Sequence, residues 1–153
     1  PLHVAQAGEV IVIDDGVRFE ILNPSNQSPA TSDQSDNEGS VAMRLEYGNF
    51  SLLLTGDAGA ETEIKMLAGG RPLSAVVYKA GHHGAGSSSS KLFLDTVKPQ
   101  YVVISAGEGN NYGHPHEEVL ERAADVGAAV LRTDELGTIE VITDGKGLWW
   151  QAR

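Results

Sequence analysis

Two short blocks of this sequence combine the residue types that hydrolytic metal centres use. One is L-L-L-T-G-D at Leu52–Asp57 and the other is K-A-G-H-H-G at Lys79–Gly84. Each places a metal-type side chain beside a glycine, after an apolar run that is typical of a strand. Strands fix the position of a ligand, and glycine lets the backbone approach an ion closely. The pattern therefore indicates a metal site with Asp57, His82 and His83 as candidate metal ligands.

Asp57 by itself is compatible with two roles. Its carboxylate could bridge two divalent ions at the end of a strand. Alternatively, it could cap the helix that we expect over residues 58–68, by accepting hydrogen bonds from the first helix amides. Considered without the histidine block, the position is more typical of a helix cap.

His82 and His83 lie between two glycines after an apolar run. Neighbouring side chains on extended backbone point in opposite directions, so both histidines cannot normally bind one ion. We expect one to be the ligand and the other to support it by a hydrogen bond or to contact substrate. The alternative is a turn with two solvated imidazoles, but the flanking glycines favour a functional role.

A run of four serines, Ser87–Ser90, precedes an expected helix over residues 91–97. Hydroxyls and helix amides at such a place can hold a phosphate oxygen, which makes Ser87 and Ser88 candidate substrate contacts. The alternative is a flexible loop in which Ser90 is the helix N-cap.

The block N-N-Y-G-H-P-H at Asn110–His116 adds further imidazoles. His114 lies where an N-cap would precede the helix expected over 115–126, yet it could also donate to a substrate oxyanion. His116 is expected at the surface in the first turn of that helix. His3 belongs to no motif.

Hydrophobic periodicity and turn signals predict the elements that must position these residues. The order of elements favours an α/β fold with a mixed β-sheet and helices packed on one face. Residues 23–39 form a long polar loop, and Ile64, Leu67 and Ala68 share one face of their helix. Strands are expected over 9–13, 17–22, 40–47, 50–55, 73–78, 101–105, 129–132, 138–143 and 148–151, and helices over 58–68, 91–97 and 115–126. The first two strands, the next two and the last two are each expected to form a hairpin. Trp149 and Trp150 alternate faces on the last strand, and one of them is expected in the core rather than as a base-stacking platform.

The composition limits the kinds of site and partner. A chain of 153 residues favours a single domain, and without cysteine any metal must be held by nitrogen and oxygen ligands, as suits zinc, manganese or iron. The formal net charge of −10, with 11 scattered Lys and Arg residues, argues against a basic duplex-binding face. A polyanionic substrate would therefore need bound cations, or basic residues from elsewhere, to attract it. No stretch approaches the ~20 apolar residues of a membrane helix.

Taken in order, these blocks resemble the metallo-β-lactamase fold and, more narrowly, the hydrolase-like C-terminal domain of ComEC-type DNA-internalisation competence proteins. The resemblance extends over nearly the whole chain from Gly8 onward. The matching blocks are Asn37 with Ser40 leading into Val41–Leu45, then Leu52–Asp57, Lys79–Gly84, Val97–Ser105, Asn110–Leu120 and Arg132–Ile139.

The resemblance implies a metal-dependent phosphodiesterase or nuclease that takes part in DNA uptake and transformation. Asp57 would match the metal-bridging aspartate, and His83 would be the ligand of the later histidine motif. His114 would contact substrate, so the candidate catalytic residues are Asp57, His83 and His114. A bound zinc or manganese ion would activate water to attack a phosphodiester. The partner would be DNA, and the chain would be a soluble domain of a polytopic bacterial plasma-membrane protein.

The chain also departs from the family pattern. The main ligand cluster of the family, a His-x-(His/Asp)-x-Asp-His run, does not occur in this sequence. We therefore expect residues 1–153 to be the second half of the domain, one half of an αββα sandwich. Without its N-terminal half and membrane domain, the chain would bind metal weakly or not at all and would be nearly inactive. Its uncovered apolar sheet could cause self-association.

Two other functions remain open. The chain could belong to a generic soluble metallo-hydrolase that acts on a small ester, thioester or phosphodiester. It could also be a catalytically inert scaffold or regulatory domain, in which Asp57 is only a helix cap.

Overall fold

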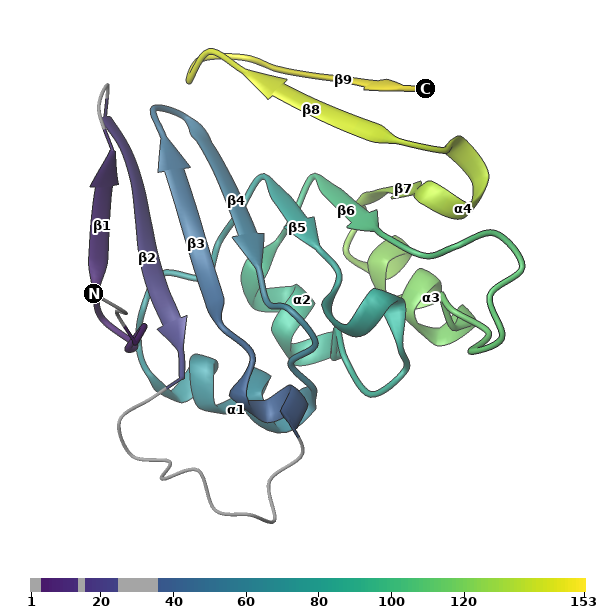
Figure 1. Cartoon of the computed structure of the whole chain (residues 1–153), viewed down its shortest axis with the longest axis horizontal. Coiled ribbons are helices and arrows are strands. Elements are labelled where there is room, and N and C mark those ends of the chain that lie inside the picture. Colours follow the sequence, from purple (N-terminus) through teal and green to yellow (C-terminus); the bar gives the residue numbers. More distant parts are fainter. Residues whose placement is uncertain (1–3, 14–15, 25–35) are drawn as a thin grey trace.

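The computed structural model describes residues 4–13, 16–24 and 36–153. Within them the chain forms an α/β fold built on one seven-stranded mixed sheet, with a separate two-stranded sheet near the C-terminus (Figure 1). The predicted fold class is confirmed.

The first half of the seven-stranded sheet is antiparallel, and both predicted hairpins are confirmed. The second hairpin turns at Gly48, whose φ of +56° suits glycine. In the first hairpin, Asp14 and Asp15 lie outside the described residues. The four strands, each paired with the next, are β1 (Val10–Ile13), β2 (Val17–Asn23), β3 (Ala42–Tyr47) and β4 (Phe50–Leu54).

The second half of the sheet is parallel and alternates with helices, as predicted. After β4 come α1 (Ala60–Ala68), β5 (Val77–Lys79), α2 (Lys91–Val97), β6 (Tyr101–Ile104), α3 (Glu117–Asp125) and β7 (Ala129–Arg132). Strands β4 to β7 are parallel neighbours, so the strands lie in the sheet in the order of the sequence. The carboxyl ends of β4, β5 and β6 therefore meet at one edge.

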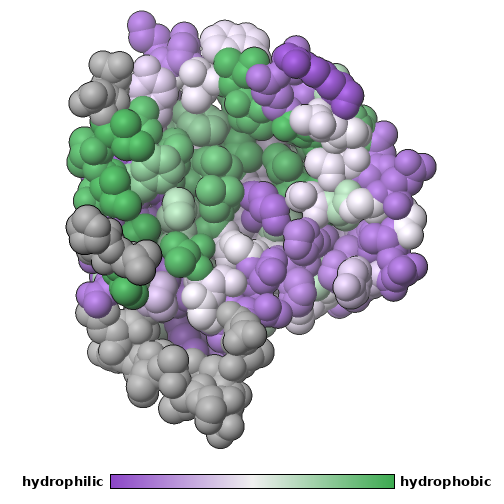
Figure 2. Space-filling model, in the orientation of Figure 1, coloured by the Kyte–Doolittle hydropathy of each residue, from purple (hydrophilic) through white to green (hydrophobic). Residues whose placement is uncertain are grey.

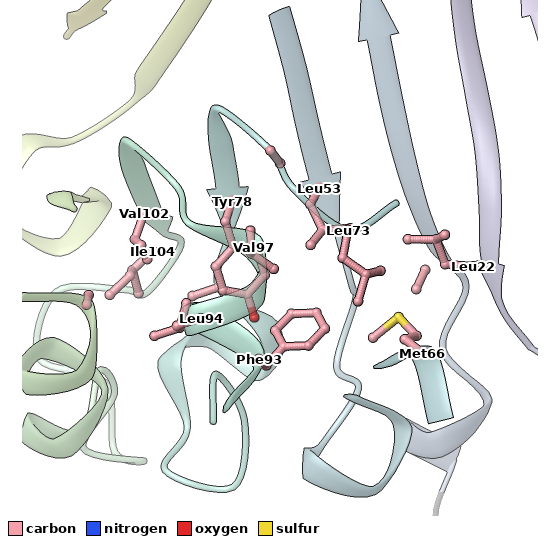
Figure 3. Packing of buried hydrophobic residues seen from close by; sticks show 14 residues of the cluster. Leu22, Leu53, Met66, Leu73, Tyr78, Phe93, Leu94, Val97, Val102 and Ile104 are labelled. Atoms are coloured by element: carbon pink, nitrogen blue, oxygen red, sulfur yellow. The ribbon is translucent and has the colours of Figure 1, made fainter. Parts of the chain in front are cut away.

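Helices α1, α2 and α3 pack on one face of the sheet, and the core lies between the two layers (Figures 1 and 3). Leu53, Tyr78 and Val102 are neighbours in register on β4, β5 and β6, and all three are fully buried. The ring of Phe93 on α2 meets the Tyr78 ring edge-on, with 5.8 Å between the ring centroids. The core thus holds the site-bearing strands and the helices as one unit.

The other face of the sheet is also apolar. Side chains alternate along a strand, so Leu52 and Leu54 point away from the helices. Figure 2 shows hydrophobic side chains gathered over the strands on the displayed face. At the edge of the sheet, Ile11 and Ile13 of β1 are 48% and 52% exposed. In the part of the chain that the structure describes, this apolar surface is only partly covered.

The helices differ in two ways from what the sequence suggested. The buried residues of α1 are Thr62, Glu63 and Met66, whereas Ile64 is 60% exposed. The reason is that the Glu63 carboxylate accepts hydrogen bonds from loop amides, and this rotates a polar residue towards the interior. In addition, a single turn α4 (Thr133–Leu136) follows β7, where no helix was predicted.

The remaining differences lie in the connections. The predicted strand over 73–78 is shorter, although Leu73 and Ala75 are buried. Within the predicted polar loop 23–39, Asn23 belongs to β2 and Asp36–Gly39 form a 3-10 turn, while 25–35 lie outside the described residues.

The predicted closing hairpin is confirmed, but it forms a sheet of its own. It consists of β8 (Ile139–Thr143) and β9 (Leu148–Ala152). Its turn contacts the turn between β3 and β4, because the Asn49 amide donates a hydrogen bond to the Gly145 carbonyl at 2.7 Å. Trp149 and Trp150 are 56% and 41% exposed, so the expectation that one of them is a core residue was wrong.

Candidate functional site

The candidate site lies where β4, β5 and β6 end. Loops that follow these strands surround a pocket of about 660 Å³. The pocket contains the aspartate and three of the histidines that the sequence singled out. Its lining residues are Asp57, His82, His83, Ser105, Ala106, Gly107, Asn110, Tyr112 and His114.

Asp57 faces this pocket and does not cap α1. The N-cap position of α1 is Gly59, and no side chain bonds to the free amides there. The backbone of Asp57 is held by Ser40, whose hydroxyl accepts a hydrogen bond from the Asp57 amide at 3.1 Å. Gly56, with a φ of +57°, provides the sharp bend before it. The Asp57 carboxylate is therefore available to the pocket, with 44% of the side chain exposed.

His83 is positioned as a metal ligand would be. Its Nδ1 lies 2.7 Å from the Ser105 carbonyl oxygen, so Nδ1 must carry the proton and donate it. Its Nε2 then has a lone pair and lies 3.7 Å from Asp57 Oδ1. An imidazole that donates one N–H to a backbone carbonyl is held in the tautomer and orientation that metal binding requires. Asp57 and His83 thus converge on a common position.

His82 points in a different direction from His83, for a reason that the sequence did not reveal. His82, His83 and Gly84 have φ values of +45°, +56° and +81°, so the pair lies in a left-handed turn and not on extended backbone. The His82 amide donates to the Gly56 carbonyl at 3.0 Å, which joins this turn to the Asp57 loop. The His82 ring lies 5.8 Å from that of His114, edge to face. His82 therefore lies on the side of the pocket that His114 lines.

A network of buried polar side chains holds the turn that carries His82 and His83. The Tyr78 hydroxyl accepts a hydrogen bond from the Gly81 amide and contacts Ser89 Oγ, each at 3.1 Å. Glu63 accepts hydrogen bonds from the amides of Ser89 and Ser90, the latter at 2.9 Å. Burial raises the pKa of Tyr78 to about 12 and also raises the pKa of Glu63. Sequence analysis missed both residues, because an apolar strand and a helix surface gave no sign of a shared network.

The two candidate substrate serines have different environments. Ser88 is fully buried, and its single hydroxyl hydrogen is shared between the carbonyls of Gly81 and Ala85, which lie 2.7 and 2.9 Å from Oγ. In this conformation Ser88 stabilises the turn and does not face a pocket. Ser87 is exposed and lines a second pocket of about 360 Å³ that also contains Asp57 and His82. Ser90 occupies the N-cap position of α2 but makes no side-chain cap bond.

His116, and not His114, occupies the N-cap position of the following helix. The N-cap position of α3 is His116, so His114 is outside the helix and faces the pocket. His116 is not a simple surface residue, because its Nδ1 accepts a hydrogen bond from the Gly86 amide at 3.0 Å. Burial, followed by repulsion from His116, His82 and His83, lowers the pKa of His114. His114 therefore favours the neutral form.

The described residues do not form a complete metal-binding set. Among residues 4–13, 16–24 and 36–153, no group of three or more His, Cys, Asp or Glu side chains is arranged to hold a metal ion. Asp57 and His83 fit two positions of a nitrogen and oxygen ligand set, whereas zinc sites have about four ligands. The nearby ammonium group of Lys79 donates to the Ala80 carbonyl at 2.9 Å. Burial lowers the pKa of Lys79. Additional ligands must come from outside these residues if an ion is to bind tightly.

Comparison with known proteins gives a consistent pattern. The sequence matches no family model. It is 38% identical over 139 residues to ComE operon protein 3 of Bacillus subtilis, an alignment that covers 91% of this chain and 17% of the relative. It is 40% identical to competence protein ComA of Neisseria gonorrhoeae and 36% identical to recombination protein 2 of Haemophilus influenzae, and each alignment covers 82% of this chain. These alignments cover 18% and 15% of the two relatives.

The chain therefore spans less than a fifth of the length of the curated relatives it matches. None of the helices among the described residues is both long and apolar enough to cross a membrane. Two of the three relatives named above carry competence or the ComE operon in their names, and the alignments cover most of this chain. The similarity supports a competence-protein domain.

Proposed function

We propose that this chain is the second half of a metal-dependent phosphodiesterase domain in a protein for DNA uptake. The observation that carries the proposal is the 3.7 Å separation of Asp57 Oδ1 and His83 Nε2, with His83 oriented by the Ser105 carbonyl. The names of the relatives support the role in competence. The nuclease chemistry rests on the site residues and on the resemblance to the metallo-β-lactamase fold.

Asp57 and His83 would hold a zinc or manganese ion together with ligands from the first half of the domain. Such an ion supplies a Lewis acid and lowers the pKa of a coordinated water. Asp57 contributes negative charge, and the Ser105 carbonyl keeps the proton of His83 on Nδ1 so that Nε2 can coordinate. His82 would lie beside such an ion, on the side of the pocket that leads to His114.

His114 would contact the substrate. Its lowered pKa keeps the ring neutral near pH 7, and a neutral imidazole has one donor nitrogen and one acceptor nitrogen. It can therefore donate to a phosphate oxygen without adding charge beside the metal. Ser87, in the second pocket that Asp57 also lines, is the second candidate contact with the phosphate.

The apolar surface opposite the helices would be covered by the first half of the domain in the parent protein. Burial of apolar area of this kind stabilises by roughly 25 cal/mol per Å². In the chain alone this surface would favour self-association. The parent would be a polytopic plasma-membrane protein, of which this is a soluble domain.

The test compares the parent protein with the chain of 153 residues. The parent should cleave DNA with Mn²⁺ or Zn²⁺. Asp57→Asn or His83→Ala should reduce the rate by about 100-fold, the upper end of the range for loss of a residue that only supports a ligand. The matched control is Asp95→Asn, because Asp95 is equally exposed but lies on α2 and pairs with Lys91. The chain alone should show almost no turnover.

Three outcomes would replace the proposal. Robust cleavage by the isolated chain would show that the site is complete without a first half. Full DNA uptake by Asp57→Asn and His83→Ala would favour the inert scaffold, for which the incomplete ligand set is the supporting observation. Turnover of small esters but not of DNA would favour a generic hydrolase.

A further inference from the structure

Tyr112 is an aromatic residue at the edge of the pocket that none of the preceding roles uses. It lines the pocket together with Asp57 and His114, yet it is 79% exposed. Its ring lies parallel to that of His114, with a centroid distance of 5.7 Å and an interplanar angle of 25°. One side of the tyrosine ring is thus turned towards His114, and so large an exposure leaves the rest accessible to a ligand.

The loop that carries Tyr112 is held in place by Asn110. The Asn110 side-chain oxygen accepts hydrogen bonds from the amides of Tyr112 and His114, at 3.2 and 3.1 Å. Its side-chain nitrogen donates to the carbonyls of Gly107 and His114, at 2.9 and 2.6 Å. A rigid aromatic side chain loses little conformational entropy when a ligand binds to it. Tyr112 is therefore already positioned for binding.

The charge of the site decides which contact a nucleic acid could use. Of the described residues that line the pocket, none is lysine or arginine, and the whole chain carries a formal net charge of −10. Non-specific binding to nucleic acid usually depends on contacts between basic side chains and phosphates, which this surface does not offer. Stacking of a base on an aromatic ring requires no positive charge and tolerates any sequence.

We propose that Tyr112 is a stacking platform for one unpaired nucleobase beside the candidate metal site. The proposal rests on the proposed function and extends it by naming the substrate class as single-stranded DNA or a frayed end. A base within a duplex is covered by its neighbours on both faces, so only an unstacked base can lie on Tyr112. The phosphate next to that base would then lie near His114 and Asp57.

The test measures binding and cleavage separately in the parent protein. The probe is a short single-stranded oligonucleotide with 2-aminopurine, whose fluorescence falls when the base stacks. Tyr112→Ala should weaken binding by roughly 5- to 150-fold, the usual range for one stacked base, and should remove the quenching. Tyr112→Phe should keep both, because the ring and not the hydroxyl makes the contact.

The matched control is Trp149→Ala. Trp149 is also an exposed aromatic residue, at 56%, but it lies on β9 and does not line the pocket. This variant should bind the probe like the unchanged protein. Since both side chains are at the surface, each variant is expected to fold, which circular dichroism would check.

The possible results distinguish failure of the stacking role of Tyr112 from failure of the proposed nuclease function. If no metal supports cleavage but Tyr112→Ala still loses single-strand binding, the nuclease assignment fails and the stacking platform stands. If the protein cleaves DNA and Tyr112→Ala binds the probe normally, the platform is refuted alone. It is also refuted if the parent does not bind the probe, if duplex binds as tightly as single strand, or if Trp149→Ala has the same effect.

Discussion

Two loops bring histidines to the same pocket, but they are held in different ways. The loop of residues 81–90 is bonded to the interior, by Glu63 of α1, Tyr78 of β5 and Arg122 of α3. The loop of residues 107–116 is largely exposed and is organised mainly by Asn110, a member of the loop itself. The first loop carries the candidate metal ligand His83 and the second carries the candidate substrate contacts His114 and Tyr112.

This contrast fits the demands of the two roles. A metal ligand must be held to within a fraction of an ångström, and a network of buried hydrogen bonds provides that rigidity. A substrate contact must remain accessible, so its loop lies at the surface. We therefore expect changes beneath the first loop to affect the stability of the whole fold and changes in the second to affect mainly the local structure.

The largest effect is expected for Glu63→Ala. The change leaves the amides of buried Ser89 and half-buried Ser90 without their acceptor, and it opens a cavity where the fully buried Glu63 side chain was. Two unsatisfied donors, one of them fully buried, should lower the free energy of unfolding by about 3 kcal/mol. Urea unfolding would measure this, with Glu61→Ala as the control, because Glu61 is on the same helix but exposed and paired with Lys65. A loss below about 1 kcal/mol would contradict the role of the buried network.

A smaller effect on stability is expected for Asn110→Ala. The change removes the side chain that joins Gly107, Tyr112 and His114. The backbone groups that lose this partner lie in an exposed loop and can bond to water instead. The free energy of unfolding should fall by about 1 kcal/mol, while amide hydrogen exchange within 107–114 should increase. Asn111→Ala is the matched control, since Asn111 is exposed and should change neither quantity. An unfolding loss as large as that of Glu63→Ala would remove the contrast between the loops.

The smallest effect concerns the pH dependence that His114 contributes. Its pKa in the folded state lies below the ordinary value of 6.5, because burial and the three neighbouring imidazoles oppose protonation. The unfolded chain therefore binds the proton more readily, and the contribution to stability is present above pH 6.5 and decreases as the pH falls through that value. Below the lowered pKa the loss levels off. Urea unfolding between pH 7.5 and 5 should show a smaller decrease for His114→Gln than for the unchanged chain, and equal decreases would contradict the direction of the shift.

Much of the site could be predicted because it depends on local signals and on one topological rule. Asp57 and His83 each follow an apolar strand, and the ends of neighbouring parallel strands share an edge, so their convergence follows from the order of the elements. The orientation of the two adjacent histidines, His82 and His83, could not be predicted. The expectation for these histidines assumed extended backbone. The structure has a left-handed turn instead, and this turn depends on hydrogen bonds with Tyr78 and with Ser88.

The residues that were missed or misplaced are those whose environment is provided by distant parts of the chain. Glu63 is buried because amides 26 and 27 residues later need an acceptor. Ser88 is buried by the same loop packing, and His116 is held by an amide 30 residues earlier. Single-residue propensities describe neighbours in sequence, and therefore they carry no information about such partners.

The sequence alone determined which elements form, their order, and the strand ends at which the aspartate and the histidines appear, because turn glycines and apolar periodicity act over a few residues. Only the tertiary structure decided which imidazole nitrogen faces Asp57, which serine is buried, and that Tyr112 stands exposed beside His114. Those outcomes depend on hydrogen bonds and packing between elements, and such contacts exist only once the helices lie on the sheet.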